Sequence, residues 1–375
     1  MRTTIWEKES FFADCDIMIA GSGLLGLWTA FELKQQKPSL DILVIDKYPI
    51  PQGASTRNAG FACFGSPSEI IHDVETLGEE ATWDIVDMRY RGIQKIRQYC
   101  KDDLIGYEPS GGYEVFNSSN AYLSVVREKL PWLNDKMKVI TGAGESFAWT
   151  SEKITLFGLS GFDSMTENRL EGALHSGKLV LYLQSALAAK GVRFLHSTEL
   201  LAWQQLSSNI CIETNHGKLH AQRLVIAANA FNTSLQSHDE IVPGRGQVIV
   251  TSPIPSLKLY GTFHFDEGFY YFRNVGNRIL LGGARNISFD SEKTTSFETS
   301  EPVQSRLRAF LHQHIGQAYD YTIDYSWSGI MAFTGTGLPT IHKPDEHVFM
   351  ATSCNGMGVA LTPIFAEKLT KEIIA

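Results

Sequence analysis

The chain has 375 residues, 43% of them hydrophobic, and a formal net charge of −8 at pH 7. Its length favours about two domains and allows a sizeable core. The negative charge and the lack of a basic run argue against a nucleic-acid partner. Five scattered cysteines without a C-x-x-C pair favour reduced thiols in a cytoplasmic protein, and we expect neither a signal peptide nor a membrane span.

A buried strand, a glycine turn and the start of a helix follow one another in residues 16–26. Gly21, Gly23 and Gly26 have the G-x-G-x-x-G spacing of dinucleotide-binding sites. There the glycines make the tight turn, admit the pyrophosphate and let the helix pack on the strand. The N–H groups at the helix start would face the phosphates. A plain βαβ unit whose glycines only turn the chain is the alternative.

The residues after this motif support the dinucleotide interpretation. Apolar residues recur at helical spacing from Leu24 to Phe31, and Pro38 ends that helix. A second buried strand, residues 41–45, leads to Asp46, which stands about 20 residues beyond the glycines. A carboxylate at this position is expected to bind the hydroxyls of an adenosine ribose. It would repel a 2′-phosphate, so NADP is disfavoured.

Beyond Asp46 the α/β pattern is interrupted and later resumes. The expected elements are helices over residues 68–105 and 179–190, strands over 192–200 and 223–230, antiparallel strands within 242–285, and a strand over 347–352 followed by a terminal helix. The nucleotide-binding domain is therefore predicted to be discontinuous. We expect it to comprise residues 1–70, 160–235 and 325–375, and a substrate-binding domain to comprise residues 71–159 and 236–324.

Residues 53–61 form a second motif, Gly-Ala-Ser-Thr-Arg-Asn-Ala-Gly-Phe. Hydroxyls, an arginine, an amide and glycines in one loop suit the binding of phosphate and of a polar ring edge. Ordinary turn chemistry has the same composition. The glycine motif upstream favours the binding interpretation.

With these motifs in this order, the chain resembles the flavin-dependent D-amino-acid oxidase superfamily, which includes glycine oxidase, sarcosine oxidase and γ-glutamylputrescine oxidase-like enzymes. The matching segments are Gly21–Gly26, Asp46, Ser55–Asn58, Ala227–Ala230, Gly244–Gln247, Arg278–Gly283, Trp327–Ile330 and Asn355–Gly358. The resemblance implies bound FAD in a doubly wound, Rossmann-like α/β domain. It also implies an inserted α+β substrate domain built on a mixed, largely antiparallel sheet.

The resemblance also assigns roles to residues. Leu200 is expected to offer backbone hydrogen bonds to adenine, and residues 356–358 to border the pyrimidine edge of the flavin, where a helix N-terminus favours flavin reduction. The expected cofactor-binding residues are Gly21, Ser22, Gly23, Leu24, Leu25, Gly26, Asp46, Lys47, Ser55, Thr56, Arg57, Asn58, Ala59, Gly60, Phe61, Leu200, Ala227, Ala228, Asn229, Asn355, Gly356, Met357, Gly358, Val359 and Ala360. No metal site is expected, because His264, His342 and His347 lack ligand spacing.

The substrate pocket departs from that of the amino-acid-oxidising relatives. Where they place an arginine that clamps the substrate carboxylate, this chain has Met331, which favours an amine or a longer, more apolar substrate. Arg285 and Arg245 are candidate replacements, although structural salt bridges would explain them equally well. Met331 also cannot form the covalent flavin bond of sarcosine oxidase, so non-covalent FAD is expected. Tyr270 stands at the spacing of a substrate-facing tyrosine, unless it only builds the sheet.

The expected reaction is hydride transfer to the flavin from the carbon beside an amine. The imine is then hydrolysed, and dioxygen reoxidises the flavin to give hydrogen peroxide. An FAD-dependent 2-hydroxy-acid or glycerol-phosphate-type dehydrogenase that passes electrons to a quinone or another carrier shares the motifs and stays open. An NAD-dependent dehydrogenase would leave the loop at residues 55–60 without a role. A non-catalytic flavin-binding protein is a further alternative.

Overall fold

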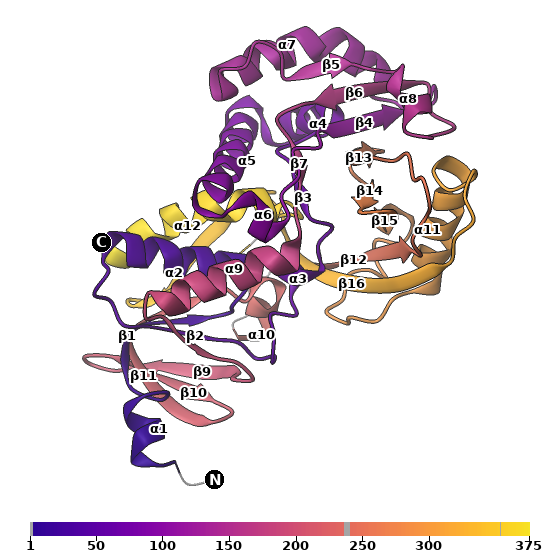
Figure 1. Cartoon of the computed structure of the whole chain (residues 1–375). Helices are drawn as coiled ribbons and strands as arrows, with labels where there is room; N and C mark the ends of the chain where they lie inside the picture. The colour runs from indigo at the N-terminus through magenta and orange to yellow at the C-terminus, as the bar shows by residue number, and fades with distance from the viewer. Residues whose placement is uncertain (1–2, 236–240, 353) are drawn as a thin grey trace.

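The computed structural model of the protein describes residues 3–235, 241–352 and 354–375 (Figure 1). Two eight-stranded sheets organise these residues. Their strand orders are β17-β18-β11-β1-β2-β8, extended by β10 and β9, and β16-β12-β15-β14-β13-β4-β6-β5. The predicted α/β class with a second, mixed and largely antiparallel sheet is confirmed.

The first sheet is parallel at its centre, where β1 pairs with β2 and β11. Every residue of β2 is buried, as in central parallel strands that are covered on both faces. The strands are β1 (Cys15–Ala20), β2 (Ile42–Ile45), β8 (Arg193–Leu195), β9 (Leu200–Gln205), β10 (Ile210–Thr214), β11 (Gly217–Ile226), β17 (Thr340–Asp345) and β18 (Val348–Thr352). The single strand expected over residues 192–200 is thus two strands, because the chain turns at Ser197, whose φ is 55°.

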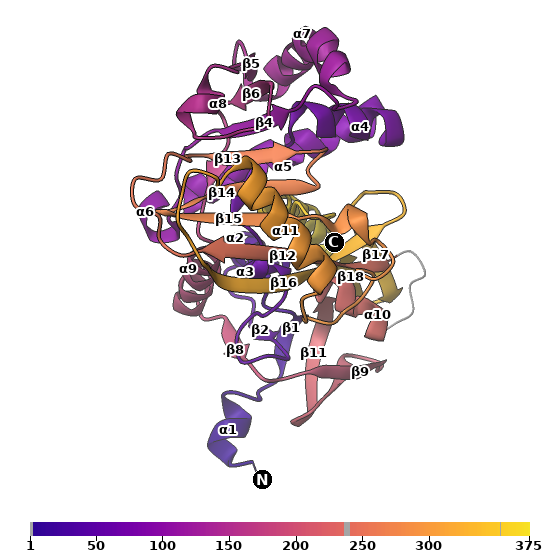
Figure 2. The same ribbon diagram turned by 90° about the vertical axis from the view of Figure 1, so that its right-hand side faces the viewer.

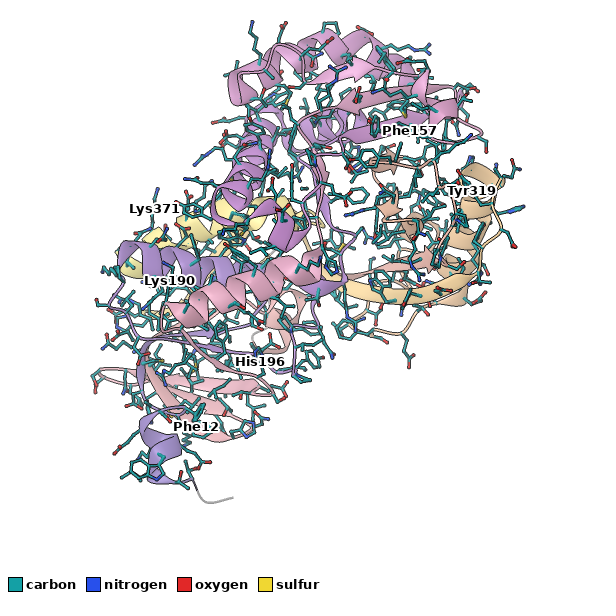
Figure 3. All side chains as sticks on the ribbon, viewed as in Figure 1. Phe12, Phe157, Lys190, His196, Tyr319 and Lys371 are labelled. Carbon is teal, nitrogen blue, oxygen red and sulfur yellow. The ribbon has the colours of Figure 1, made fainter. Side chains whose placement is uncertain are left out.

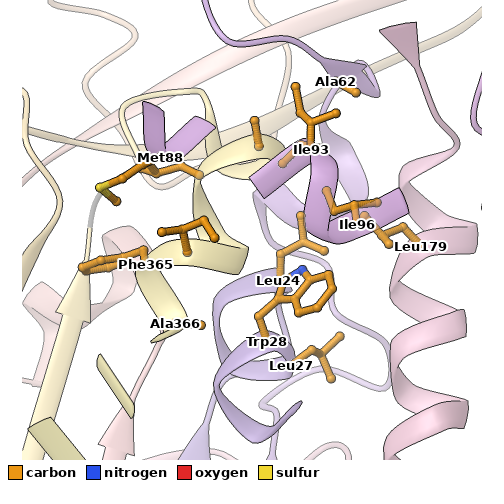
Figure 4. Close-up of a cluster of buried hydrophobic side chains, with 14 of the residues drawn as sticks. Leu24, Leu27, Trp28, Ala62, Met88, Ile93, Ile96, Leu179, Phe365 and Ala366 are labelled. Atoms are coloured by element: carbon orange, nitrogen blue, oxygen red, sulfur yellow. The ribbon is translucent and has the colours of Figure 1, made fainter. Parts of the chain in front are cut away.

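Helices cover one face of the first sheet, and the antiparallel extension formed by β9, β10 and β11 covers the other. Ile17 and Ile19 of β1 pack toward the helices, whereas Met18 packs toward the extension. The covering helices are α2 (Leu24–Gln36), α9 (Ser176–Ala189) and α12 (Gly358–Ile374), with α5 (Glu79–Tyr99) packed on α12. Figure 4 shows Trp28 of α2 and Ile96 of α5 within this shared core. The core fixes where α2 and α12 begin.

The second sheet is antiparallel except at the β13–β4 pair. Helix α11 (Glu301–His314) packs on its outer face through residues such as Leu307 and Phe310 (Figure 2). The strands are β4 (Gly112–Phe116), β5 (Phe147–Trp149), β6 (Ser164–Asn168), β12 (Ile241–Thr251), β13 (Thr262–Phe265), β14 (Tyr270–Val275), β15 (Arg278–Gly283) and β16 (Ile323–Thr334). In Figure 3, Phe157 and Tyr319 lie beside this sheet, and His196 lies beside the first.

The remaining elements connect and flank the two sheets. They are helices α1 (Ile5–Glu9), α3 (Ala54–Arg57), α4 (Pro67–Leu77), α6 (Asp102–Ile105), α7 (Leu123–Thr141), α8 (Lys153–Leu156) and α10 (Asn232–Leu235), the 3-10 turns η1 (Asn229–Phe231) and η2 (Arg285–Ile287), and the strand pair β3 (Phe61–Ala62) and β7 (Gly172–Ala173). None of the helices in the described part of the chain is long and apolar enough to cross a membrane.

The residues at which the chain passes from one sheet to the other differ from the predicted domain boundaries. Strand β6 pairs with β4 and β5, and β16 pairs with β12 along its whole length. Both strands thus belong to the second sheet, although the predicted boundaries at residues 160 and 325 assign most of their residues to the FAD-binding domain. Their pairing partners are distant in sequence, and periodicity within a strand carries no information about them.

Candidate active site

A cavity of about 500 Å³ lies between the carboxyl ends of the parallel strands and the inner face of the second sheet. Ala20, Ile45, Ala227 and Thr352, which end or directly follow β1, β2, β11 and β18, line one side. Ligands of open α/β sheets bind at this position, outside the carboxyl ends of the strands. The cavity therefore lies where the sequence predicts a nucleotide.

The glycine turn after β1 leaves no room for side chains. Gly21 has a φ of 115°, and a Cβ on it would lie 2.5 Å from the carbonyl oxygen of Ala227. A Cβ on Gly26 would lie 1.9 Å from the carbonyl oxygen of Gly21, which brings α2 close to β1. The backbone N–H of Leu24 donates to the Ser55 Oγ (2.8 Å). The turn and the N-terminus of α2 thus have the shape and polarity of a pyrophosphate cradle.

Asp46 is held in a fixed orientation at the end of β2. Its Oδ2 accepts hydrogen bonds from the backbone N–H (2.9 Å) and the hydroxyl (2.7 Å) of Ser22, and its Oδ1 accepts one from the N–H of Tyr48 (3.1 Å). Ser22 is fully buried, whereas Asp46 lines the cavity. The carboxylate is therefore presented to the cavity as an acceptor for hydroxyl groups.

The loop at residues 53–61 is organised from within by Asn58. Its Nδ2 donates to the carbonyls of Ala54 (3.1 Å) and Ser55 (2.9 Å), and its Oδ1 accepts from the Gly60 N–H (2.8 Å) and the Ser176 hydroxyl (2.6 Å). A single amide side chain thus fixes both ends of the loop.

Arg57 ties the same loop to the second sheet. Its guanidinium donates to the carbonyl of Ser328 (2.9 Å), and its own carbonyl accepts from the indole N–H of Trp327 (2.9 Å). The guanidinium also lies 4.7 Å from the ring centre of Phe297. These contacts hold the loop in place where the first and second sheets meet.

The N-terminus of α12 closes the opposite end of the cavity. Asn355 and Gly356, with φ of 42° and 87°, turn the chain into this helix of 17 residues. The Oδ1 of Asn355 accepts from the N–H of Thr334 (3.3 Å), which fixes the turn against the end of β16. A helix of this length directs partial positive charge into the cavity.

These features fit FAD. Two helix N-termini, a carboxylate at the end of β2 and a crowded glycine turn line one elongated cavity. The resident residues would contact the pyrophosphate at Gly21–Leu25, the ribose at Asp46 and the flavin at Gly356–Ala360.

A row of paired residues crosses the inner face of the second sheet. Its members are Glu114, His264, Tyr271, Gly282, Val248 and Trp327, each directly opposite the next on the neighbouring strand. Directly paired residues point to the same face of a sheet. His264, Tyr271 and Val248 of this row line the cavity.

Tyr270 lies on the other face of the sheet, away from the cavity. It is buried in the core of the second domain, stacks on Phe310 (4.5 Å between ring centres) and accepts a hydrogen bond from Arg306 (3.0 Å). Successive strand residues alternate between faces, so the side chain of Tyr271 faces the cavity instead. Of the two adjacent tyrosines of β14, Tyr271 and not Tyr270 therefore lines the cavity.

The two candidate replacement arginines have different surroundings. Arg245 is buried, donates through Nε and Nη2 to the carboxylate of Glu292 (2.7 Å each) and through Nη1 to the Glu298 carbonyl (2.6 Å). This pairing raises its pKa, and its role is structural. Arg285 lines the cavity, and within the described residues its guanidinium has neither a carboxylate nor a hydrogen-bond acceptor as partner.

His264 is a buried ionisable side chain on the cavity wall, with 4% exposure. Its Nδ1 lies 3.4 Å from Oε2 of Glu69, the N3 residue of α4. Burial by itself would lower the pKa of His264, but the carboxylate of Glu69 raises it well above its ordinary value. Likewise His264 and the Ser66 N–H lower the pKa of Glu69 to about 2 despite burial. The pair is therefore an imidazolium–carboxylate pair at neutral pH.

The family model of DAO, described as FAD dependent oxidoreductase, matches residues 16–372. The chain belongs to this family. The γ-glutamylputrescine oxidoreductase of Escherichia coli is 23% identical over 379 residues, covering 96% of this chain and 83% of the relative.

Two solved structures share the fold of this DAO-family chain. The crystal structure of glycine oxidase from Geobacillus kaustophilus has a TM-score of 0.75 at 20% identity and covers 96% of this chain and 94% of its own. The L-α-glycerophosphate oxidase of Mycoplasma pneumoniae with FAD bound has a TM-score of 0.74 at 14% identity and covers 97% and 95%. The protein is an FAD-dependent oxidoreductase.

The cavity brings together most of the residues expected at the site of this DAO-family protein, including Met331 and Arg285. Ser22, Gly26, Thr56 and Gly60 do not line it. Ser22 orients Asp46, Gly26 packs α2 on β1, Thr56 donates to the Pro51 carbonyl, and the Gly60 carbonyl accepts from Arg273 (2.8 Å). These four residues act through their neighbours.

Sequence reasoning missed several cavity residues that lie outside the family motifs. Tyr271, Cys63, Glu69 and Glu267 line the cavity, and so does His264, which the sequence-based expectations considered only as a metal ligand. For Tyr271 the signal was the alternation of faces along the strand. For Glu69 it was the capping box that begins at Ser66, which places a carboxylate at a helix start.

Proposed function

We propose that the protein oxidises the C–N bond of a small amine or amino acid to an imine, using non-covalently bound FAD and dioxygen and releasing hydrogen peroxide. FAD, when bound, would supply the hydride acceptor. The residues of the chain hold the substrate beside it, exclude water and set the charge of the cavity. Met331 offers no thiol at the position of the flavin-linking cysteine, which supports non-covalent binding.

The pairing of His264 with Glu69 is the observation that carries this proposal. Oxidation of an alcohol by hydride transfer needs a base that takes the hydroxyl proton. His264 is held in its acid form by Glu69, and burial raises the pKa of the Tyr271 phenol to about 12, so that neither group is ready to accept a proton at neutral pH. A neutral amine supplies its own lone pair, and this favours amine over hydroxy-acid substrates.

The test is anaerobic bleaching of the flavin in the purified holoenzyme. The panel contains D- and L-amino acids, N-methylated amino acids and simple amines, together with 2-hydroxyglutarate and glycerol 3-phosphate. We expect amines to bleach the flavin and air to restore its colour with release of peroxide. Bleaching by the hydroxy compounds alone, with slow recovery in air, would establish the dehydrogenase alternative.

A further inference from the structure

Just beyond the end of β15, the cavity is lined by Arg285, whose guanidinium has no hydrogen-bonded or ion-paired partner among the described residues. Arg285 is half-buried, and within the described residues its contacts are with aromatic rings: its guanidinium lies 4.2 Å from the ring centre of Phe333 and 5.0 Å from that of Phe289. Aromatic rings leave the N–H donors of an arginine without acceptors. Removing such a cation from water without an anion is unfavourable, so the arrangement indicates a site for an anionic ligand.

The guanidinium lies next to the position at which the relatives' arginine is missing. Met331 of β16 is directly opposite Gly244 of β12 in the antiparallel ladder. A Cβ on Gly244 would lie 3.0 Å from Nη1 of Arg285. The bare backbone of Gly244 therefore lets Arg285 reach across β12 to the neighbourhood of Met331 from the opposite side.

The phenol of Tyr271 reaches the same place. A Cβ on Gly282 would lie 2.7 Å from the Tyr271 hydroxyl, so this glycine lets the ring lie across β15. A Cβ on Gly246 would lie 3.7 Å from that hydroxyl and 2.9 Å from Cε of Met331. The hydroxyl of Tyr271 thus lies with the Met331 side chain beside Gly246, two residues along β12 from Gly244, where the guanidinium of Arg285 lies. Because the phenol keeps its proton at neutral pH, it can donate a hydrogen bond.

We propose that Arg285 and Tyr271 form an oxyanion-binding subsite, which makes the substrate an amine that carries a carboxylate or a chemically similar oxyanion. This inference rests on the proposed function and narrows its substrate class. The planar fork of an arginine matches two oxygens of one carboxylate, and a phosphate or phosphonate offers similar oxygens. Met331 then supplies an apolar contact to the carbon chain next to the anionic group.

The first experiment measures anion binding without turnover. Benzoate and inorganic phosphate are titrated into the oxidised holoenzyme, and the change in flavin absorption gives the dissociation constant. We expect Arg285→Met to weaken benzoate binding about 100-fold, and Arg285→Lys and Tyr271→Phe about 10-fold. Arg278→Met is the matched control, because Arg278 begins β15, the strand that leads to Arg285, pairs with Asp324 (2.6 Å) and does not line the cavity.

The outcomes separate the sources of the oxyanion. Tighter binding of benzoate than of phosphate, lost in Arg285→Met, supports a carboxylate, and the reverse order supports a phosphate or phosphonate. Equal benzoate binding by the wild type and by Arg285→Met, with FAD retained in both, would overturn the subsite. So would a wild-type holoenzyme that binds neither anion.

The second experiment compares substrates that differ only in the anionic group. Anaerobic flavin reduction is measured with alanine and ethylamine, and with glycine, methylamine and aminomethylphosphonate. We expect Arg285→Met to slow flavin reduction by the anionic amines much more than flavin reduction by the anion-free amines. Arginine-dependent anion binding without reduction by any amine would overturn the proposed amine oxidation alone. Equal reduction by ethylamine and alanine in both proteins would overturn the subsite alone.

Discussion

At the scale of single residues, Asp46 and Ser22 give a direct test of the cofactor site. Asp46→Asn keeps the size of the side chain but removes the charge that accepts hydrogen bonds from ribose hydroxyls and from Ser22. We expect its dissociation constant for FAD to rise about 10- to 100-fold, and that of Ser22→Ala about 5-fold, because Ser22 only orients the carboxylate. Fluorescence titration of the apoprotein with FAD measures both. Equal affinities in all three proteins would place the ribose elsewhere.

The carboxyls buried near His264 make the stability depend on pH. Burial raises the pKa of Glu114 from 4.5 to about 7, so the folded state loses stability as the pH rises through that range. The contribution of Glu69 to stability depends on pH in the opposite direction. Its lowered pKa stabilises the fold above about pH 4.5, and that contribution is lost as the pH falls towards 2. Glu114→Gln should therefore raise the free energy of unfolding by about 2 kcal/mol at pH 8 and change it little at pH 5.

Urea denaturation of the wild type and Glu114→Gln at the two pH values measures this difference. The amide keeps an oxygen that accepts from the Ser68 N–H (3.0 Å in the wild type), so local packing is preserved. Glu80→Gln, exposed at the start of α5, is the control and should show the same free energy as the wild type at both pH values. An effect of Glu114→Gln that is equal at pH 5 and pH 8 would contradict a titrating origin.

At the scale of elements, the crossing of α5 and α12 positions the flavin end of the cavity. A Cβ on Gly92 would lie 1.7 Å from the carbonyl oxygen of Ala360. Gly92→Ala should therefore push the N-terminus of α12 away, lower the free energy of unfolding by about 2 kcal/mol and weaken FAD binding. Gly144→Ala is the control, since no atom lies within 4 Å of its added Cβ. Unchanged FAD affinity in Gly92→Ala would mean that α12 does not contact the cofactor.

The elements themselves follow closely from local patterns. Apolar spacing correctly predicts helices α2 and α9 and the buried strand β2, because each pattern reports which face of one element is covered. Pairing between distant strands leaves no such local signal. The assignment of β6 and β16 to the second sheet, and the bend at Ser197, therefore emerge only from the structure.

At the scale of the whole molecule, the residues expected to bind the cofactor can be predicted from the sequence. The other residues that line the cavity can be predicted only in part. Gly21 and Asp46 stand in motifs whose spacing is set by the cofactor's own dimensions. His264 and Tyr271 stand in one row of cross-strand pairs, and the bare backbones of Gly282 and Gly244 leave room for Tyr271 and Arg285, so the placement of these side chains depends on the register of several strands. The sequence indicated Arg285 as a candidate, but it did not indicate Tyr271, with which we propose that Arg285 forms a subsite.

One cavity joins segments from both ends of the chain, and this has a measurable consequence. Four segments, residues 21–25, 55–61, 227–229 and 355–360, each contribute residues to its lining. FAD should therefore slow amide hydrogen exchange in all four segments at once, because a ligand that binds only the closed cavity suppresses its local opening. Exchange in α7, which lies at the top of Figure 1 and contributes no residue to the cavity lining, should not change. Mass spectrometry of the apoprotein and holoprotein measures this, and protection confined to residues 21–25 would mean that the flavin does not reach α12.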